Sequence, residues 1–255
     1  MIKQSLLLLT LLIYIGCGSS DSTSTTSNTP ATGQSGSRAQ YAIVGDYLYT
    51  VNSGVMDIFD ISDASQPTPV SKVRLPWDVE TLFAYKDYLY IGAKSGVYIY
   101  DNSIPIQPTS IAKFSHVQSC DPVVVSDDIA YVTLNTENRC WNNRTGVNRL
   151  EILDVRDPKN PKLIKTLDMW APTGLGVDGN KLFICDGKSG LKAFEVTKND
   201  NNGIVTIDLD IKSSNTEINC YDVIAHKDNL IVSNSDEIRQ FDYSSFPMEE
   251  LGRIK

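Results

Sequence analysis

The stretch YLYTVNSGVMDIFDISD, residues 47–63, decides the fold because the chain repeats it. A second version, YLYIGAKSGVYIYDNS, covers residues 88–103. Three altered versions follow: IAYVTL with LEILDVRD (129–134 and 150–157), KLFICDGKSGLKAFEV (181–196) and LIVSNSDEIRQFDYSS (230–245). A unit that recurs at about 40–50 residues is typical of a stacked or radial architecture. The repeat therefore indicates a repetitive fold before any single motif is considered.

Each unit shows the same order of signals. An aromatic or aliphatic anchor comes first, and an acid ends the next apolar run. The anchors are Tyr49, Tyr90, Tyr131, Phe183 and Ile231, and the acids are Asp60, Asp101, Asp154, Glu195 and Asp242. Residues suited to a tight reversal lie between them in four units: Gly54, Gly96, Gly190 and Asp236. Turns rich in Ser, Asp, Asn and Pro follow the acids, which predicts strand pairs joined by short turns.

Each unit reads as four strands, which in the second unit cover residues 80–85, 88–93, 97–101 and 109–114. Their Val, Ile, Tyr and Phe content favours β-structure. Many strand positions are apolar on both faces, and such a sheet needs cover on both sides. No amphipathic stretch of helical length can supply that cover. We therefore expect sheets packed on sheets.

A five-bladed β-propeller with four antiparallel strands per blade meets this requirement, because each blade covers its neighbours. A β-sandwich or an irregular barrel is the alternative, but neither accounts for a five-fold repeat. The ring is expected to close by packing of the last blade on the first. The expected blades are residues 39–76, 77–115, 116–169, 170–213 and 214–255.

Two segments, DIFDISD (57–63) and EILDVRDP (151–158), resemble the motif that names the LVIVD-repeat proteins. Two further segment pairs are similar to a lipoprotein branch of that family: SCDPV (119–123) with AYVT (130–133), and GLG (174–176) with LFICDG (182–187). The resemblance covers most of residues 40–255 and implies a bacterial, propeller-like and often exported protein. It departs in the fourth unit, whose turn at 197–203 lacks prolines. The family implies no settled activity.

The first 38 residues read as an export and anchoring segment. Residues 1–16 contain Lys3 and an apolar run of about ten residues, which fits a signal peptide and is too short to span a membrane. The run ends in YIGC, which resembles a bacterial lipobox and predicts lipidation of Cys17, although Tyr14 departs from the usual Leu. An ordinary signal peptide is the alternative. Residues 17–38 are small and polar, as in a flexible linker. Because Gly18 is not an aspartate, the outer membrane is the expected location.

Composition limits the partners. The formal net charge is −8, and no basic stripe is present, which argues against nucleic acid. The remainder, 39–255, has the size of one domain and is expected to be monomeric. Its partners are then the membrane, through the lipid anchor, and an envelope protein, a glycan or a host component. No cofactor motif is recognisable.

Five cysteines are an odd number for an exported chain. Lipidation of Cys17 leaves four. Cys120 precedes the first strand of unit three and Cys140 follows its second strand, so both lie at the same rim and a disulfide between them is expected. Cys185 and Cys220 share that rim across a blade boundary and form a possible second pair, with two buried thiols as the alternative.

Alignment of the units places several side chains at the start of the innermost strands, around the mouth of the central channel. The carboxylates Glu80, Asp121 and Asp222, with Asp78 nearby, could hold a hard cation such as Ca²⁺, or they could simply cap strand ends. Aromatic and polar neighbours complete the candidate binding rim: Trp77, Trp141, Trp170, Thr173 and Tyr221.

The sequence predicts a binding scaffold rather than an enzyme. It has only two histidines, and neither lies at an interpretable spacing from a nucleophile. A glycoside-hydrolase-like propeller with Glu80, Asp121 and Asp222 as central carboxylates is one alternative, since such enzymes need carboxylates that flank the scissile bond. An envelope assembly factor is the other. We therefore expect no catalytic residues.

Overall fold

The computed structural model describes residues 36–117, 119, 122–136 and 146–255. They form five four-stranded antiparallel sheets. Blade 1 consists of β1 (Tyr41–Val44), β2 (Tyr47–Asn52), β3 (Val55–Asp60) and β4 (Thr68–Arg74). Blade 2 consists of β5 (Val79–Tyr85), β6 (Tyr88–Ala93), β7 (Gly96–Asp101) and β8 (Thr109–Ser115). Blade 3 consists of β9 (Val123–Ser126), β10 (Ile129–Asn135), β11 (Asn148–Asp154) and β12 (Lys162–Asp168).

Blade 4 consists of β13 (Leu175–Asp178), β14 (Lys181–Cys185), β15 (Leu191–Asn201) and β16 (Ile204–Asn215), with a single 3₁₀ turn, η1 (Gly187–Ser189), before β15. Blade 5 consists of β17 (Asp222–His226), β18 (Asn229–Ser233), β19 (Ile238–Asp242) and β20 (Glu249–Ile254). Within every blade the strands pair in chain order. The first strands pack on one another in sequence, β1 on β5, β5 on β9, β9 on β13 and β13 on β17, so they lie around a common axis. The predicted five-bladed β-propeller is confirmed.

Apolar residues on both faces of each sheet hold the blades together, as the repeat predicted. In blade 2, Leu82 and Leu89 face blade 1, whereas Tyr90 and Ile99 face blade 3. Alternation along a strand makes this possible, because neighbouring side chains point to opposite faces. Each of the four apolar clusters joins two consecutive blades. The core is therefore a series of blade interfaces rather than one central core.

The anchor residues are buried in the first four blades and exposed in the last one. Tyr49, Tyr90, Tyr131 and Phe183 are at most 3% exposed, each covered by the next blade. The anchor of blade 5, Ile231, is 41% exposed. It shares its face of the sheet with Ile238, which is 46% exposed. The last blade thus has an uncovered apolar face.

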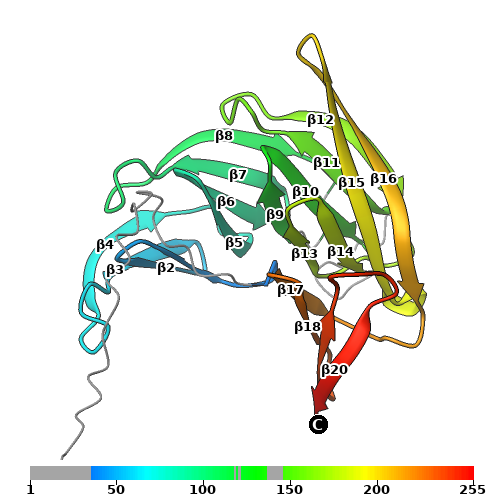
Figure 1. The fold of residues 1–255 in the computed structure, drawn as a ribbon. Helices are drawn as coiled ribbons and strands as arrows, with labels where there is room; N and C mark the ends of the chain where they lie inside the picture. The colour runs from blue at the N-terminus through cyan, green and yellow to red at the C-terminus, as the bar shows by residue number, and fades with distance from the viewer. Residues whose placement is uncertain (1–35, 118, 120–121, 137–145) are drawn as a thin grey trace, which may run out of the picture.

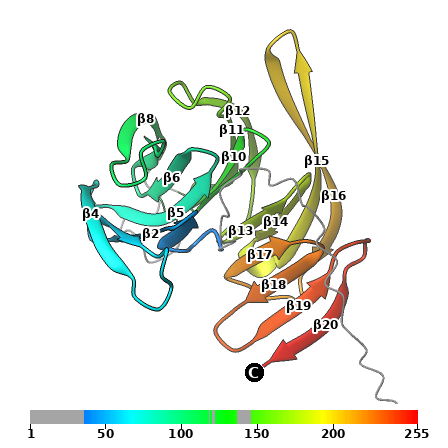
Figure 2. The ribbon, with the colours of Figure 1, turned by 60° about the vertical axis from the view of Figure 1, so that its left-hand side comes forward.

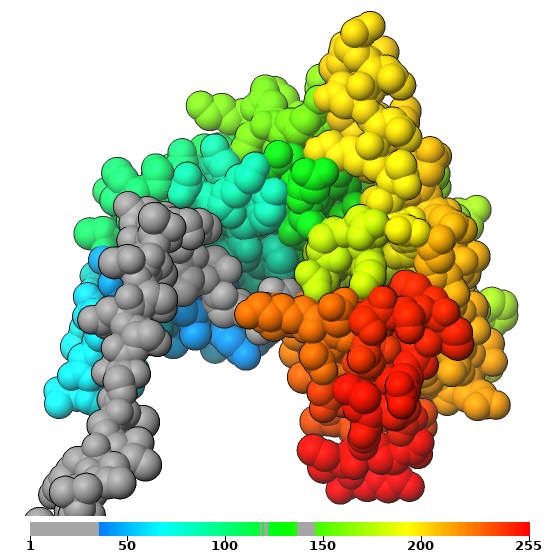
Figure 3. All heavy atoms as spheres, viewed as in Figure 1, coloured from blue at the N-terminus to red at the C-terminus, as the bar shows by residue number. Residues whose placement is uncertain are grey.

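The expected closure of the ring differs from what the structure shows. Within the described residues, no strand of blade 5 packs on blade 1 as consecutive blades pack on one another. Figure 1 shows the five blades as an arc, and the space-filling view in Figure 3 shows an opening between its first and last blades. Leu48 of blade 1 is accordingly half-buried, although the residue before the anchor is fully buried in the other four blades.

A short N-terminal segment, residues 36–40, connects the two ends of the arc near the axis. The Ser37 hydroxyl donates to Asp222 Oδ1 at the start of β17 (2.9 Å), and it accepts the Leu175 amide of β13 (2.8 Å). The Ala39 carbonyl accepts the Leu82 amide of β5 (2.9 Å). The segment thus contacts blades 4 and 5 and continues directly into β1 of blade 1, which begins at Tyr41.

Blade 4 departs from the other blades in two ways. Its β15–β16 hairpin is much longer and projects beyond the other blades (Figure 2). A disulfide, Cys185–Cys220, ties β14 to the segment before β17, with the two Cα atoms 5.5 Å apart. Of the two alternatives left open for Cys185 and Cys220, the disulfide is the one present, whereas Cys120 and Cys140 lie outside the described residues. Among the described residues, no helix has the length and hydrophobicity to cross a membrane.

Candidate functional site

The predicted binding rim is the rim at which β1, β5, β9, β13 and β17 begin, and we call it the entry rim. Three of its aromatic side chains are strongly exposed: Trp77 (74%), Trp170 (58%) and Tyr221 (52%). Each lies in the connection that leads into an innermost strand, in blades 2, 4 and 5 respectively. Thr173, by contrast, is buried, and its carbonyl accepts the Thr133 hydroxyl (2.6 Å). The aromatic residues are therefore accessible to a partner, whereas Thr173 joins blades 3 and 4.

The carboxylates of the entry rim do not form an open acidic ring. Glu80 forms an ion pair with Lys94 (3.8 Å). Asp78 is 8% exposed, and its carbonyl accepts the Lys94 amide. Asp121 and Trp141 lie outside the described residues.

The Asp222 carboxylate is covered by the N-terminal segment, residues 36–40. The carboxylate accepts the Ser37 hydroxyl and the Arg38 amide. Burial raises the pKa of Asp222, and the hydrogen bonds from Ser37 and from the backbone oppose that rise. Gly174 is required beside it, because a Cβ there would lie 2.2 Å from Asp222 Oδ1. Asp222 therefore fastens the N-terminal segment to the hub.

No group of three His, Cys, Asp or Glu side chains suitable for a metal ion occurs in the described part of the chain. The predicted Ca²⁺ site and the glycosidase-like arrangement both require Glu80 and Asp222 to converge, yet each has a separate partner. Asp121, the third acid, is not described. The carboxylate hypothesis therefore stays a prediction.

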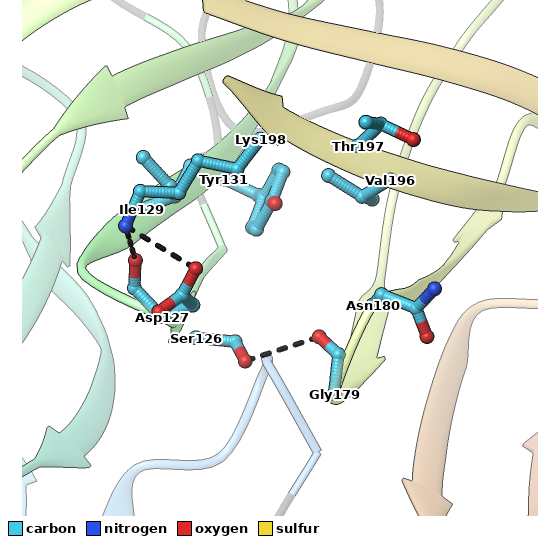
Figure 4. Close-up of a pocket in the computed structure, with 9 residues that line it drawn as sticks. All are labelled: Ser126, Asp127, Ile129, Tyr131, Gly179, Asn180, Val196, Thr197 and Lys198. Atoms are coloured by element: carbon cyan, nitrogen blue, oxygen red, sulfur yellow. Dashed lines mark hydrogen bonds and ion pairs between the residues drawn. The ribbon is translucent and has the colours of Figure 1, made fainter. Parts of the chain in front are cut away.

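A pocket lies instead at the opposite rim, between blades 3 and 4. Its volume is about 520 Å³. The turn Ser126–Asp127 and the first residues of β10 form one side, and the turn Gly179–Asn180 with residues 196–198 of β15 forms the other. Figure 4 shows these side chains around a common space. The pocket is large enough for a small sugar-sized molecule.

Tyr131, the anchor of blade 3, forms the floor of this pocket. It is 3% exposed, and Figure 4 shows its hydroxyl directed into the space. Burial raises the pKa of this phenol, and the charge of Asp127 adds to the rise. The Tyr131 hydroxyl is therefore protonated at neutral pH and can donate a hydrogen bond to a ligand.

Lys198 and Asp127, which also line the pocket, form an ion pair. Lys198 Nζ lies 3.2 Å from Asp127 Oδ2 and donates to the Asp127 carbonyl (2.7 Å). The lysine side chain is 21% exposed and the aspartate 73%. Asp127 has a positive φ of 50°, as suits a residue in a tight turn between strands. Ser126 donates to the Gly179 carbonyl (3.2 Å), which holds the two turns together. The pocket thus combines a phenol donor, a cation and a carboxylate.

The equivalent crevice between blades 1 and 2 differs from the pocket in its side-chain contacts. There the Tyr49 hydroxyl donates to the Pro105 carbonyl (3.1 Å) and accepts from Asn102 (3.0 Å). In blade 4 the residue equivalent to Asn102 is Val196, which cannot donate. The proline-containing turn is replaced by the long β15–β16 hairpin. The space that the turn fills in blade 2 is therefore open in blade 4.

Sequence reasoning missed this pocket, although its signal was present. The absence of prolines from residues 197–203 appeared only as a departure from the repeat. The residues that line the pocket are ordinary strand and turn types that no motif singles out. Val196 alone would not have marked the site, because Val155 occupies the equivalent position in blade 3.

Comparisons with known proteins give the fold but no family. No family model and no curated protein matches the chain. Among solved structures it is similar to a putative 6-phosphogluconolactonase from Bacteroides uniformis (TM-score 0.62, 13% identity, 84% of this chain and 69% of that one). It is also similar to a periplasmic gluconolactonase from Pseudomonas aeruginosa (TM-score 0.58, 16% identity, 82% and 67%). A third is AztD from Citrobacter koseri (TM-score 0.55, 12% identity, 85% and 61%). The chain thus spans about two thirds of the length of these structures.

These neighbours correct one sequence-based expectation. The protein was expected not to be an enzyme because no catalytic motif is recognisable. The same architecture is that of a gluconolactonase and of a putative 6-phosphogluconolactonase. At such low identity the likeness shows the fold alone, and one fold can host many functions. The expectation was wrong, since a propeller without a recognisable motif can carry catalysis.

Proposed function

We propose that the protein is a cell-envelope enzyme that hydrolyses a small hydroxylated cyclic ester, of the sugar-lactone class, in the pocket between blades 3 and 4. The observation that carries the proposal is the combination of the Tyr131 phenol with the Lys198–Asp127 ion pair around one space. Ester hydrolysis needs a base for water and donors for the developing oxyanion. The pocket offers both.

The roles follow from the chemistry of each group. The Asp127 carboxylate accepts a proton from a water molecule as that water attacks the lactone carbonyl carbon. The Tyr131 hydroxyl and the Lys198 ammonium stabilise the oxyanion of the tetrahedral intermediate. The ring C–O bond then breaks, and the leaving alkoxide takes the proton back from Asp127. The products are the open hydroxy acid and the unchanged enzyme.

The substrate class rests on two considerations. The phenol of Tyr131 and the ion pair of Lys198 and Asp127 suit a polyhydroxylated ligand, while Ile129 and Val196 provide apolar contact. The gluconolactonase from Pseudomonas aeruginosa and the putative lactonase from Bacteroides uniformis share the fold. Both considerations favour a lactone over the glycosidic bond that the sequence suggested.

Acid release from glucono-1,5-lactone at constant pH tests the proposal. Asp127→Asn should lower kcat about 100-fold or more, because a general base is lost. Tyr131→Phe should lower it about tenfold or more without a large change in stability. The matched control is Tyr90→Phe, the same anchor one blade earlier. An enzyme whose Asp127→Asn and Tyr131→Phe variants keep full activity would refute the assignment of this pocket.

The binding scaffold that the sequence favours remains a second candidate, and the exposure of Trp77, Trp170 and Tyr221 supports it. Aromatic side chains with this exposure are common where a surface meets a partner. Resemblance to the LVIVD-repeat lipoproteins and the lipobox-like YIGC support attachment through Cys17. Mass spectrometry of the mature amino terminus tests the attachment: an acylated cysteine is expected, and an unmodified terminus would contradict it.

A further inference from the structure

The N-terminal segment leaves the propeller at the entry rim. Ser37 is bound to Asp222 at the first residue of β17 and to Leu175 at the first residue of β13. Both strands begin at the entry rim, and so does β1 at Tyr41. The first described residues of the chain, Gly36 and Ser37, therefore lie at the entry rim.

Three aromatic side chains of the entry rim are more than half exposed. Trp77, Trp170 and Tyr221 are among the large apolar side chains that remain more than half exposed. Trp and Tyr are the residues that concentrate where a protein meets the boundary between lipid headgroups and acyl chains, because one part of the ring is apolar and another can hydrogen-bond.

The carboxylates nearest the hub at the entry rim are buried or paired, whereas Asp168, Glu217 and Asp236 farther out on this rim are exposed. Asp78 and Asp222 are mostly buried, and Glu80 is paired with Lys94. The net charge of −8 argues against attraction to anionic headgroups, so the contact would depend on the aromatic side chains rather than on charge.

We propose that the entry rim rests on the lipid bilayer, with Trp77, Trp170 and Tyr221 in the headgroup region. This inference rests on the proposed attachment through Cys17. From Cys17 to Ser37 a fully extended chain spans at most about 70 Å. Ser37 lies at the rim that bears the aromatic residues, so the described end of the segment is on the same side as the aromatic contacts. The pocket between blades 3 and 4 lies at the opposite rim and faces the solvent.

The test is fluorescence quenching of the acylated full-length protein in phosphatidylcholine vesicles that contain brominated lipid. Trp141→Phe leaves Trp77 and Trp170 as the only indole reporters. Their emission should fall about twofold or more, since quenching by brominated acyl chains requires close approach. In the matched control, all three tryptophans are replaced by Phe and Ile104→Trp supplies one reporter. Ile104 is 58% exposed in the turn after β7, at the rim opposite the entry rim, and its emission should stay unchanged.

Two results would overturn the inference, and flotation separates them. Protein that floats with the vesicles but shows no quenching of Trp77 and Trp170, or equal quenching of the Ile104→Trp reporter, is anchored with another face toward the lipid. Protein that does not float has no anchor, and both the attachment and the orientation then fail. Lactone hydrolysis, measured on the same protein in detergent, depends on neither result.

Discussion

The anchor positions give a quantitative test of the open arc, because the same repeat position is covered in blade 4 and uncovered in blade 5. Phe183 is fully buried between blades 4 and 5 and packs on the Tyr243 ring, with centroids 4.7 Å apart. Ile231, its equivalent, is 41% exposed. Truncation of each to Ala should therefore have very different effects on the free energy of unfolding.

The magnitudes follow from burial. Phe183→Ala removes a buried ring and leaves a cavity, which costs about 3–5 kcal/mol. The ring pair with Tyr243 adds about 0.5–1.5 kcal/mol to the interaction that is lost. Ile231→Ala removes a side chain that packs only within its own blade, so about 1 kcal/mol or less is expected.

Urea unfolding monitored by circular dichroism measures both changes, with the m-value as a check that the transition is comparable. The reasoning is refuted if Ile231→Ala costs as much as Phe183→Ala. That result would mean that the exposed face of blade 5 is covered in solution, by blade 1 or by a second molecule. Sedimentation of the two variants then distinguishes these occupants.

Three further predictions concern charge and crosslinks. Lys192→Met should cost about 3–5 kcal/mol, because it leaves the fully buried Asp186 carboxylate without its cation. Lys72→Met, which removes the exposed pair with Asp57, should cost only about 0–1 kcal/mol. Urea unfolding of the two variants measures the difference. Replacement of Cys185 and Cys220 by Ser should cost about 3–4 kcal/mol, since the bridge closes a loop with a sequence separation of 35; non-reducing thermal unfolding measures the loss. The folded-state pKa of Asp222 is raised, so the folded protein binds more protons here than the unfolded chain, and the contribution of Asp222 to stability falls as the pH rises through that pKa. Asp222→Asn should therefore gain stability relative to the wild type as the pH rises above about 4, and a difference that does not change with pH would contradict the assignment.

Local pattern was sufficient to predict the blades. The strands expected in the second unit, residues 80–85, 88–93, 97–101 and 109–114, are found at Val79–Tyr85, Tyr88–Ala93, Gly96–Asp101 and Thr109–Ser115. The reason is that each strand is marked twice, by apolar alternation within it and by turn residues at its ends. Because the same pattern occurs in five units, each weak local signal supports the same prediction.

Long-range features could not be read in the same way. Closure of the ring depends on the angle between successive blades, which arises from side-chain volumes at four interfaces and leaves no local signature. The partner of Asp222 is Ser37, far away in the sequence and in a segment that composition alone marks as linker. Sequence placed Asp222 correctly at the start of an innermost strand and yet could not show that the linker would cover it.

The pocket shows how a departure from a repeat creates a site. In an array of similar units, the unit that breaks the pattern loses contacts that its neighbours make, and the lost contacts become space. Blade 4 has Val196 and a long hairpin where blade 2 has Asn102 and a proline turn, so Tyr131 keeps its anchor position but not the hydroxyl partner that Tyr49 has. Introducing the asparagine of blade 2 tests this view. Val196→Asn should occupy the space above Tyr131 and reduce ligand binding, and a variant that binds glucono-1,5-lactone as tightly as the wild type would show that the space arises from the hairpin alone.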